Sequence, residues 1–265
     1  MRIVVTRPEP ECASWVQNLG ARGLQALALP LIRIGPVVDT RFVHQCWSRL
    51  GQYNAVMFVS GAAAEHFFAL RPAGAGVPGT TRFWAPGPGT AAALVRQQVS
   101  PAQVDAPDAA SGAFDSEALW RVVGHQVHAG WQVLIVRGGD EAAVEPPAEG
   151  APPRGQGREW LAQVLGQAGA RVELVMAYER TGPVWDAATQ ARAQAAAVDG
   201  SVWLFTSSQA IAHLKALLPA QTWQQSSAVA THPRIAQAAR DAGFGVVWES
   251  RPRLDDVVAS IESRA

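Results

Sequence analysis

Residues 55–63 read AVMFVSGAA, residues 202–210 read VWLFTSSQA, and these two apolar runs decide the fold. Continuous apolar runs of this length are typical of strands that are buried on both faces of a parallel sheet. A second matching pair follows at nearly the same distance, where residues 85–91 read APGPGTA and residues 230–236 read ATHPRIA. The repeat is far longer than that of a solenoid, so it predicts two similar halves.

Outward from these runs, strand-like and helix-like segments alternate along most of the chain. The further expected strands are residues 3–5, 25–29, 82–85, 133–136, 171–177, 227–230 and 245–248. The clearest helical patterns are residues 11–22, 62–70, 90–97 and 159–167. This alternation predicts the α/β fold class, with parallel sheets flanked by helices and a ligand at the carboxyl ends of the strands. The expected loops are residues 71–81, 100–113 and 140–157.

The composition argues against several classes of protein. Lysine plus arginine and aspartate plus glutamate both number 22, and a net charge of zero argues against bulk electrostatic binding to nucleic acid. No apolar run approaches the roughly 18 residues of a membrane-spanning helix, and the first residues lack the pattern of a signal peptide. Two cysteines, Cys12 and Cys46, are too few for a disulfide framework. We therefore expect a cytoplasmic protein that binds neither nucleic acid nor membrane. We also expect a monomer, although composition does not decide the oligomeric state.

No metal site is expected from the histidines. The six histidines are scattered, and their spacings match no familiar zinc motif. His125 and His128 lie three residues apart on an expected helix, but no nearby carboxylate completes a site.

Small polar residues follow the ends of the expected strands in both halves. Such positions place free backbone N–H groups, and often a hydroxyl, at the N-terminus of a helix. Helix N-termini attract anions, so several of them in both halves predict a ligand with many negative charges. Serine or threonine at any one of them is also an ordinary helix N-cap. The residues expected to bind this ligand are Thr6, Arg7, Ser60, Gly87, Gly89, Thr90, Arg137, Gly138, Thr206, Ser207, Ser208 and Arg234.

In their order and spacing, the motifs at these strand ends resemble the uroporphyrinogen-III synthase family over nearly the whole chain. The pieces include Val5-Thr6-Arg7-Pro8, Phe58-Val59-Ser60, Gly87-Pro88-Gly89-Thr90, Tyr178-Glu179-Arg180 and Phe205-Thr206-Ser207-Ser208. The sequence departs from the family pattern in three places. The first Thr-Ser pair of the family is Val59-Ser60 here, and the Arg-Gly and Arg-Glu-Trp-Leu elements, normally close together, are separated by the expected loop at residues 140–157. The second Gly-Pro-x-Thr-Ala is replaced by His232-Pro233-Arg234-Ile235-Ala236, which removes a glycine and a hydroxyl.

The resemblance implies two domains that are joined by a two-stranded connector. Domain one would comprise residues 1–35 and 181–265, and domain two residues 38–175. Residues 31–37 and 174–183 would form the two connector strands.

The resemblance also implies an enzyme that cyclises hydroxymethylbilane, a linear tetrapyrrole with many carboxylates, to uroporphyrinogen III. The terminal pyrrole ring is inverted, water is lost, and no cofactor takes part. Because the bilane also closes unaided without inversion, the main task of the enzyme would be to hold the chain so that the inverting attack wins. Tyr178 matches the tyrosine of the family and would be the general acid near the leaving hydroxyl.

Other interpretations of the same residues stay open. A non-catalytic two-domain protein that binds a polyanionic small molecule would need the same strand ends. An enzyme of nucleotides or sugar phosphates that uses Gly87 to Thr90 is disfavoured, because no carboxylate cluster for a metal is visible in the sequence. Tyr178 could also end a strand with a buried ring and a hydrogen-bonded hydroxyl.

Overall fold

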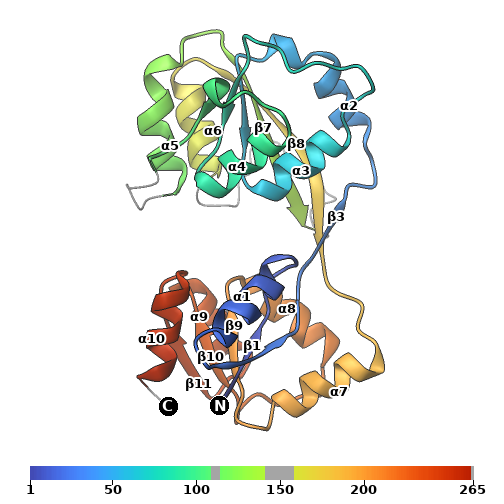
Figure 1. Cartoon of the computed structure of the whole chain (residues 1–265), viewed down its shortest axis with the longest axis vertical. Coiled ribbons are helices and arrows are strands. Elements are labelled where there is room, and N and C mark those ends of the chain that lie inside the picture. Colours follow the sequence, from blue (N-terminus) through green and yellow to red (C-terminus); the bar gives the residue numbers. More distant parts are fainter. Residues whose placement is uncertain (109–113, 141–157, 264–265) are drawn as a thin grey trace. The chain divides into compact units, whose positions relative to one another are not determined.

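The computed structural model describes residues 1–108, 114–140 and 158–263. Two compact units make up the chain (Figure 1). Unit 1 comprises Met1–Ile34 with Thr181–Ala265, and unit 2 comprises Gly35–Arg180. The chain passes between the units within two strands, β3 (Arg33–Pro36) and β8 (Arg171–Thr181), which are neighbours in one sheet.

Unit 1 is built on a five-stranded sheet with the order β11-β10-β9-β1-β2, in which every pairing is parallel. Its strands are β1 (Arg2–Val5), β2 (Gln25–Ala28), β9 (Val202–Phe205), β10 (Ser227–Ala230) and β11 (Val246–Glu249). Its helices are α1 (Glu11–Gly20), α7 (Ala187–Ala196), α8 (Ser208–Leu217), α9 (Pro233–Asp241) and α10 (Leu254–Glu262).

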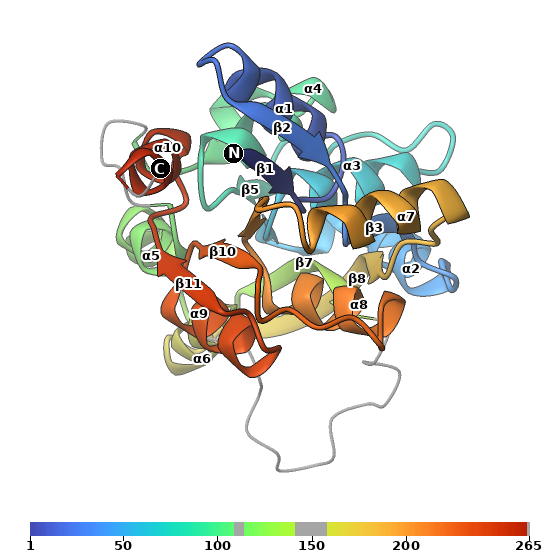
Figure 2. The ribbon, with the colours of Figure 1, turned by 90° about the horizontal axis from the view of Figure 1, so that it is seen from below.

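Alternate residues of these strands face two separate cores. Val4, Trp203 and Phe205 pack with α7, α8 and α9 on one face of the sheet. Ile3 and Leu204 pack with α1 and α10 on the other face (Figure 2). Because both faces are covered, the central strand β9 is apolar at every position, and this explains the continuous run VWLF in the sequence.

Unit 2 has a six-stranded sheet with the order β3-β8-β7-β4-β5-β6. Its other strands are β4 (Ala55–Phe58), β5 (Arg82–Trp84), β6 (Val104–Asp105) and β7 (Gln132–Asp140). Its helices are α2 (Arg41–Ser48), α3 (Gly61–Ala69), α4 (Pro88–Arg96), α5 (Ser116–Val123) and α6 (Arg158–Gln167), with short 3-10 helices at Leu50–Gln52, Pro101–Gln103 and Gly124–Gln126. One face packs Met57, Trp84 and Ile135 against α5 and α6. An aromatic cluster around Phe58 and Phe67 lies between the sheet and α3.

Several expectations about local structure need correction. The helix expected to carry His125 and His128 is wrong, because α5 ends at Val123 and His128 lies in a loop. Residues 100–108 contain a 3-10 turn and β6 rather than a plain loop, since the short strand extends the edge of the sheet. Residues 71–81 are a loop, as expected, and residues 141–157 lie outside the described residues. Among the described residues, no helix is long and apolar enough to cross a membrane.

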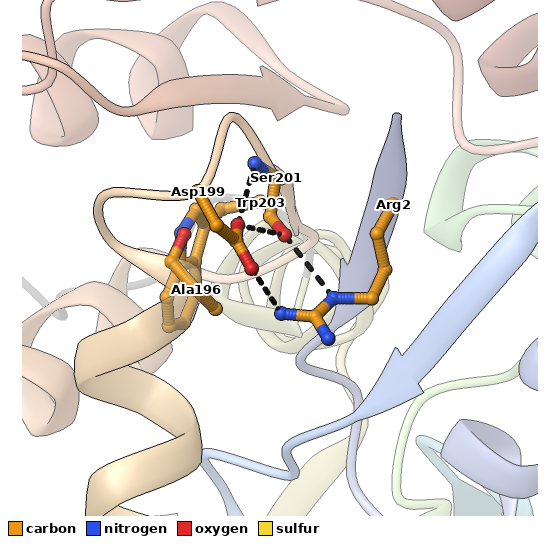
Figure 3. A network of polar contacts seen from close by, with 5 residues as sticks. All are labelled: Arg2, Ala196, Asp199, Ser201 and Trp203. Carbon is orange, nitrogen blue, oxygen red and sulfur yellow. Dashed lines mark hydrogen bonds and ion pairs between the residues drawn. The ribbon is translucent and has the colours of Figure 1, made fainter.

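A polar network joins β1 to β9 at the amino ends of these two strands in unit 1 (Figure 3). The Arg2 guanidinium pairs with Asp199, and its Nε donates to Ser201 Oγ at 3.2 Å. The Ser201 hydroxyl donates to Asp199 Oδ1 at 2.6 Å, and the Ser201 N–H donates to the same oxygen at 3.0 Å. The network therefore anchors two strands that are distant in sequence, on the edge of the sheet opposite the expected site.

We expect Asp199→Ala to lower the free energy of unfolding by about 1–2 kcal/mol, because Arg2 and Ser201 lose a common, partly exposed acceptor. Burial raises the pKa of Asp199, but the hydrogen bonds from Ser201 and the charge of Arg2 outweigh it and leave that pKa below its ordinary value. The stability that Asp199 contributes is thus present above its unfolded pKa and is lost as the pH falls through its folded pKa. Denaturant unfolding of both proteins at about pH 7 and about pH 3 checks this. The variant should be less stable than the wild type at the higher pH, and an equal deficit at both values would contradict the assignment.

Candidate functional site

The expected site residues of unit 1 lie at one edge of its sheet. Because β1, β9 and β10 are adjacent and parallel, the residues that follow them share the carboxyl edge. Thr6 is buried there, and its hydroxyl donates to the Leu204 carbonyl oxygen at 2.6 Å. Ser207 caps α8, since its Oγ accepts the Gln209 N–H at 3.2 Å. The proton of the Thr6 hydroxyl is therefore engaged in a hydrogen bond within the protein. Ser208 Oγ, by contrast, is buried and has no hydrogen-bond partner among the described residues.

Arg7 and Thr206 follow neighbouring strands at the same edge. The Arg7 guanidinium pairs with Glu11 at 2.6 Å and lies over the Trp15 ring, 4.4 Å from its centroid. The Arg7 side chain is only 16% exposed, so α1 holds this cation in place. Thr206 is partly buried and directly precedes the residue that caps α8.

The N-termini of α4 and α9, which begin at the matching residues Pro88 and Pro233, differ between the two units. In unit 2, Gly87 precedes α4 and makes no side-chain cap, and open space surrounds the position where a Cβ of Gly89 would lie. In unit 1, His232 stands in place of Gly87, and its Nδ1 accepts the Arg234 N–H at 3.1 Å. Ile235 points into the core, and the Arg234 side chain is exposed. His232 therefore occupies an N–H group that an anion could otherwise bind.

In unit 2, β5, β4, β7 and β8 are neighbouring parallel strands, so the residues at their carboxyl ends also lie along one edge of the sheet. Ser60 follows β4 and caps α3, and its Oγ accepts the Ala63 N–H at 3.2 Å. Thr90 lies in the first turn of α4 and is buried. The expectation that Arg137 and Gly138 open a helix is wrong, because β7 continues to Asp140 in pairing with the long strand β8.

A β-bulge brings Tyr178 to this edge. Arg137 pairs with Met176 and Gly138 pairs with Tyr178, so Ala177 is an extra residue in β8. Strand alternation would place Ala177 and Tyr178 on opposite faces, yet both are buried, at 0% and 1% exposure. A Cβ on Gly138 would lie 2.4 Å from the Tyr178 ring, so the ring packs directly on the backbone of β7. Tyr178 is therefore inside its strand rather than at its end.

The Tyr178 hydroxyl has two polar neighbours. Its oxygen lies 3.3 Å from Ser60 Oγ and accepts a hydrogen bond from Arg180 Nη2 at 3.1 Å. The Arg180 guanidinium also lies 5.7 Å from the centroid of the Tyr178 ring. Ser60 was expected from the sequence, but Arg180 was not assigned to the site. Its spacing of two residues from Tyr178 on a strand was the available signal, since residues i and i+2 share a face.

His66 is a further neighbour that the sequence did not reveal. Its ring centroid lies 5.7 Å from that of Tyr178. Helix α3 packs on β4 and β7, and β7 pairs with β8. Burial lowers the pKa of His66, and the charge of Glu65 opposes this only in part. Burial thus favours the uncharged form of the His66 ring beside Tyr178, whereas the Arg180 guanidinium brings a cation to the Tyr178 hydroxyl.

The structure also contains a surface pocket in unit 1 that the sequence did not indicate. Its volume is about 300 Å³, and it is lined by Glu9, Pro30, Ile32, Arg33, Ile34, Pro183 and Val184. None of the expected ligand-binding residues lines it. Within residues 1–108, 114–140 and 158–263, no group of three or more His, Cys, Asp or Glu is placed to hold a metal ion.

Comparison with known proteins agrees with this architecture. The family model described as uroporphyrinogen-III synthase HemD matches residues 13–259. The structure of uroporphyrinogen-III synthetase from Helicobacter pylori is similar with a TM-score of 0.56 and 16% identity, and the alignment covers 100% of both chains. A mutant uroporphyrinogen III synthase from Thermus thermophilus is similar with a TM-score of 0.53 and 17% identity, over 99% of this chain and 98% of that one. At these identities the two structures support the fold alone.

Proposed function

This chain belongs to the uroporphyrinogen-III synthase family, and from that premise we propose how its own residues carry out the reaction. The reaction is the cyclisation of hydroxymethylbilane, so the protein is a cyclising lyase of tetrapyrrole biosynthesis. The observation that carries this function is the family match over residues 13–259, which spans both units.

The substrate carboxylates, in our proposal, bind at helix N-termini on the carboxyl edges of the two sheets. The start of α4 supports this, because Gly87 leaves its first N–H groups without a side-chain cap and Gly89 adds no bulk. Ser207 and Ser208 supply hydroxyls at the start of α8. Backbone N–H groups and hydroxyls can bind several carboxylates without a large excess of arginine, which suits a chain of zero net charge.

The proposed role of Tyr178 is to supply the proton for loss of the hydroxymethyl oxygen. As the carbon–oxygen bond breaks, its electron pair leaves with the oxygen as water, and the lone pair of the pyrrole nitrogen, which keeps its proton, forms a protonated azafulvene. The substituted carbon of the terminal ring attacks to form a spiro intermediate, which fragments and recloses. The proton that the macrocycle then loses restores the Tyr178 hydroxyl. The cation of Arg180, which donates to Tyr178 Oη, supports this role because it stabilises the tyrosinate.

The test is incubation with hydroxymethylbilane, followed by separation of the type I and type III isomers. A cyclase yields type III in excess over the type I product that forms unaided. The alternative, a non-catalytic protein that binds a polyanion, would yield type I alone. That result would overturn the function.

Our proposal further takes the protein to be a cytoplasmic monomer that binds no nucleic acid. Both cysteines, Cys12 and Cys46, are free and buried, which suits a reducing compartment. Light scattering of the purified protein tests the oligomeric state. We also retain the domains 1–35 with 181–265 and 38–175, with connector strands 31–37 and 174–183, as a proposal that the passages through β3 and β8 support.

We expect His232→Gly to strengthen product binding by about two- to fivefold, because it frees the Arg234 N–H at the start of α9 for a carboxylate. Glycine is only slightly weaker than good N-cap residues, so α9 should stay folded. Anaerobic titration calorimetry with uroporphyrinogen III measures the change. His232→Asn is the matched control, since its side chain can still cap the helix, and equal affinities of the two variants would contradict this contact.

A further inference from the structure

The hydrogen bond between Arg180 and Tyr178 has one direction. A guanidinium carries only donors, so the Tyr178 oxygen must accept from Arg180 Nη2 across the 3.1 Å between them. One lone pair of the phenol oxygen is therefore engaged by a charged donor, which makes this the stronger of its two hydrogen bonds.

The Tyr178 proton then has one acceptor available among the described residues. Tyr178 is 1% exposed, and a buried donor left without a partner is costly. Apart from Arg180, which cannot accept, the polar neighbour of its hydroxyl is Ser60 Oγ at 3.3 Å. Tyr178 therefore donates to Ser60.

The lone pairs of Ser60 are now both in use. A serine hydroxyl has two acceptor positions and one donor. Its Oγ accepts from Tyr178 at 3.3 Å and from the Ala63 N–H at 3.2 Å, where it caps α3. The Ser60 proton is left to donate to a third partner, and Ser60, unlike Tyr178, is partly exposed at the carboxyl edge of the sheet.

We infer that Arg180, Tyr178 and Ser60 form a one-way hydrogen-bond chain that makes the Ser60 hydroxyl the donor to the leaving hydroxymethyl oxygen of the substrate. The inference rests on the proposed role of Tyr178 and deepens it. Ser60 gives its proton to the leaving oxygen and takes the proton of Tyr178, and the tyrosinate stays beside Arg180. Water departs with the electron pair of the broken bond, and the proton lost at ring closure returns along the same chain. Arg180 and Tyr178 are then positioning residues that act through Ser60.

The test separates the hydroxyl of Ser60 from its capping role. Ser60→Gly removes the hydroxyl, yet glycine is an acceptable N-cap, and Ser60→Thr keeps both hydroxyl and cap. We expect Ser60→Gly to lower kcat for type III formation by about tenfold, as for Tyr178→Phe, with KM within about twofold. Ser60→Thr should restore kcat to within about threefold of the wild type. If Ser60→Gly does not fold, Ser60→Asp replaces it, because aspartate caps the helix and accepts from Tyr178 but cannot donate.

A double variant tests the chain itself. If Tyr178 acts through Ser60, the pair Ser60→Gly with Tyr178→Phe should be no slower than either single variant. Losses that multiply would overturn the chain, as would a Ser60→Gly variant that changes KM alone, since Ser60 would then hold a carboxylate. If Tyr178→Phe lowers kcat but Ser60→Gly is fully active, the hydrogen-bond chain through Ser60 is wrong, whereas the proposed role of Tyr178 as proton donor is retained. Full activity of Tyr178→Phe would remove that role as well.

Discussion

Replacing Tyr178 with phenylalanine is expected to lower the rate of type III formation by about tenfold or more while the fold stays intact. The proposed proton donor is lost, and general acids typically contribute ~10²–10⁴-fold. Only one oxygen is removed, and the ring still packs on Gly138. Arg180 loses an acceptor, so the free energy of unfolding should fall by about 1 kcal/mol. Turnover of hydroxymethylbilane with isomer separation gives the first quantity, and denaturant unfolding gives the second.

The other tyrosine of the chain provides a matched control. Tyr53 is also buried in unit 2, and its hydroxyl donates to Glu173 Oε2 at 2.7 Å. Tyr53→Phe therefore loses a comparable hydrogen bond away from Ser60 and should keep full activity at reduced stability. If Tyr178→Phe also keeps full activity at reduced stability, Tyr178 has a structural role only. Catalysis would then consist of holding the bilane in the conformation that favours the inverting attack.

Gly138→Ala is expected to be damaging both to stability and to activity. The added Cβ would lie 2.4 Å from Cε2 and Cζ of Tyr178 and 2.8 Å from its Oη. The ring is buried and cannot turn away, so we expect a loss of about 1–3 kcal/mol in the free energy of unfolding. The displaced hydroxyl would leave both Ser60 and Arg180, and type III formation should fall by about tenfold or more. Unfolding and turnover are measured on the same preparation.

Gly139→Ala controls for the extra methyl group in the same strand. Its Cβ would lie 2.4 Å from Met176 Sδ, but that side chain is flexible and 40% exposed, so it can rotate away. The Gly139 variant should keep both its stability and its activity much closer to those of the wild type. Equal effects of the two substitutions would show that β7 tolerates no methyl group here, and they would remove the argument for a specific contact with Tyr178.

Local patterns in the sequence were enough to predict the alternating strands and helices and the α/β fold class. The runs AVMF and VWLF became β4 and β9 because strands covered on both faces must be apolar at every position. The hydroxyl residues after them, Ser60 and Ser207, cap the helices that follow. Both features depend on neighbours within a few residues, so composition and periodicity report them. The same logic failed at Arg137, where a strand was expected to end and instead continues.

Only the tertiary structure decided which polar groups meet and which are already engaged. Tyr178 and Ser60 are 118 residues apart, and a single extra residue, Ala177, turns the ring toward α3. The Thr6 hydroxyl was an equally plausible ligand in the sequence, yet it donates to Leu204, 198 residues away. A hydroxyl has one proton, which it can donate either to another group of the protein or to a ligand. Which of the two it does depends on strand pairing and register, because these set the distances between residues that are remote in sequence. The sequence by itself therefore determined the sheets, the helices and the candidate edge, and the packing of β7, β8 and α3 decided which hydroxyls at that edge are free to act.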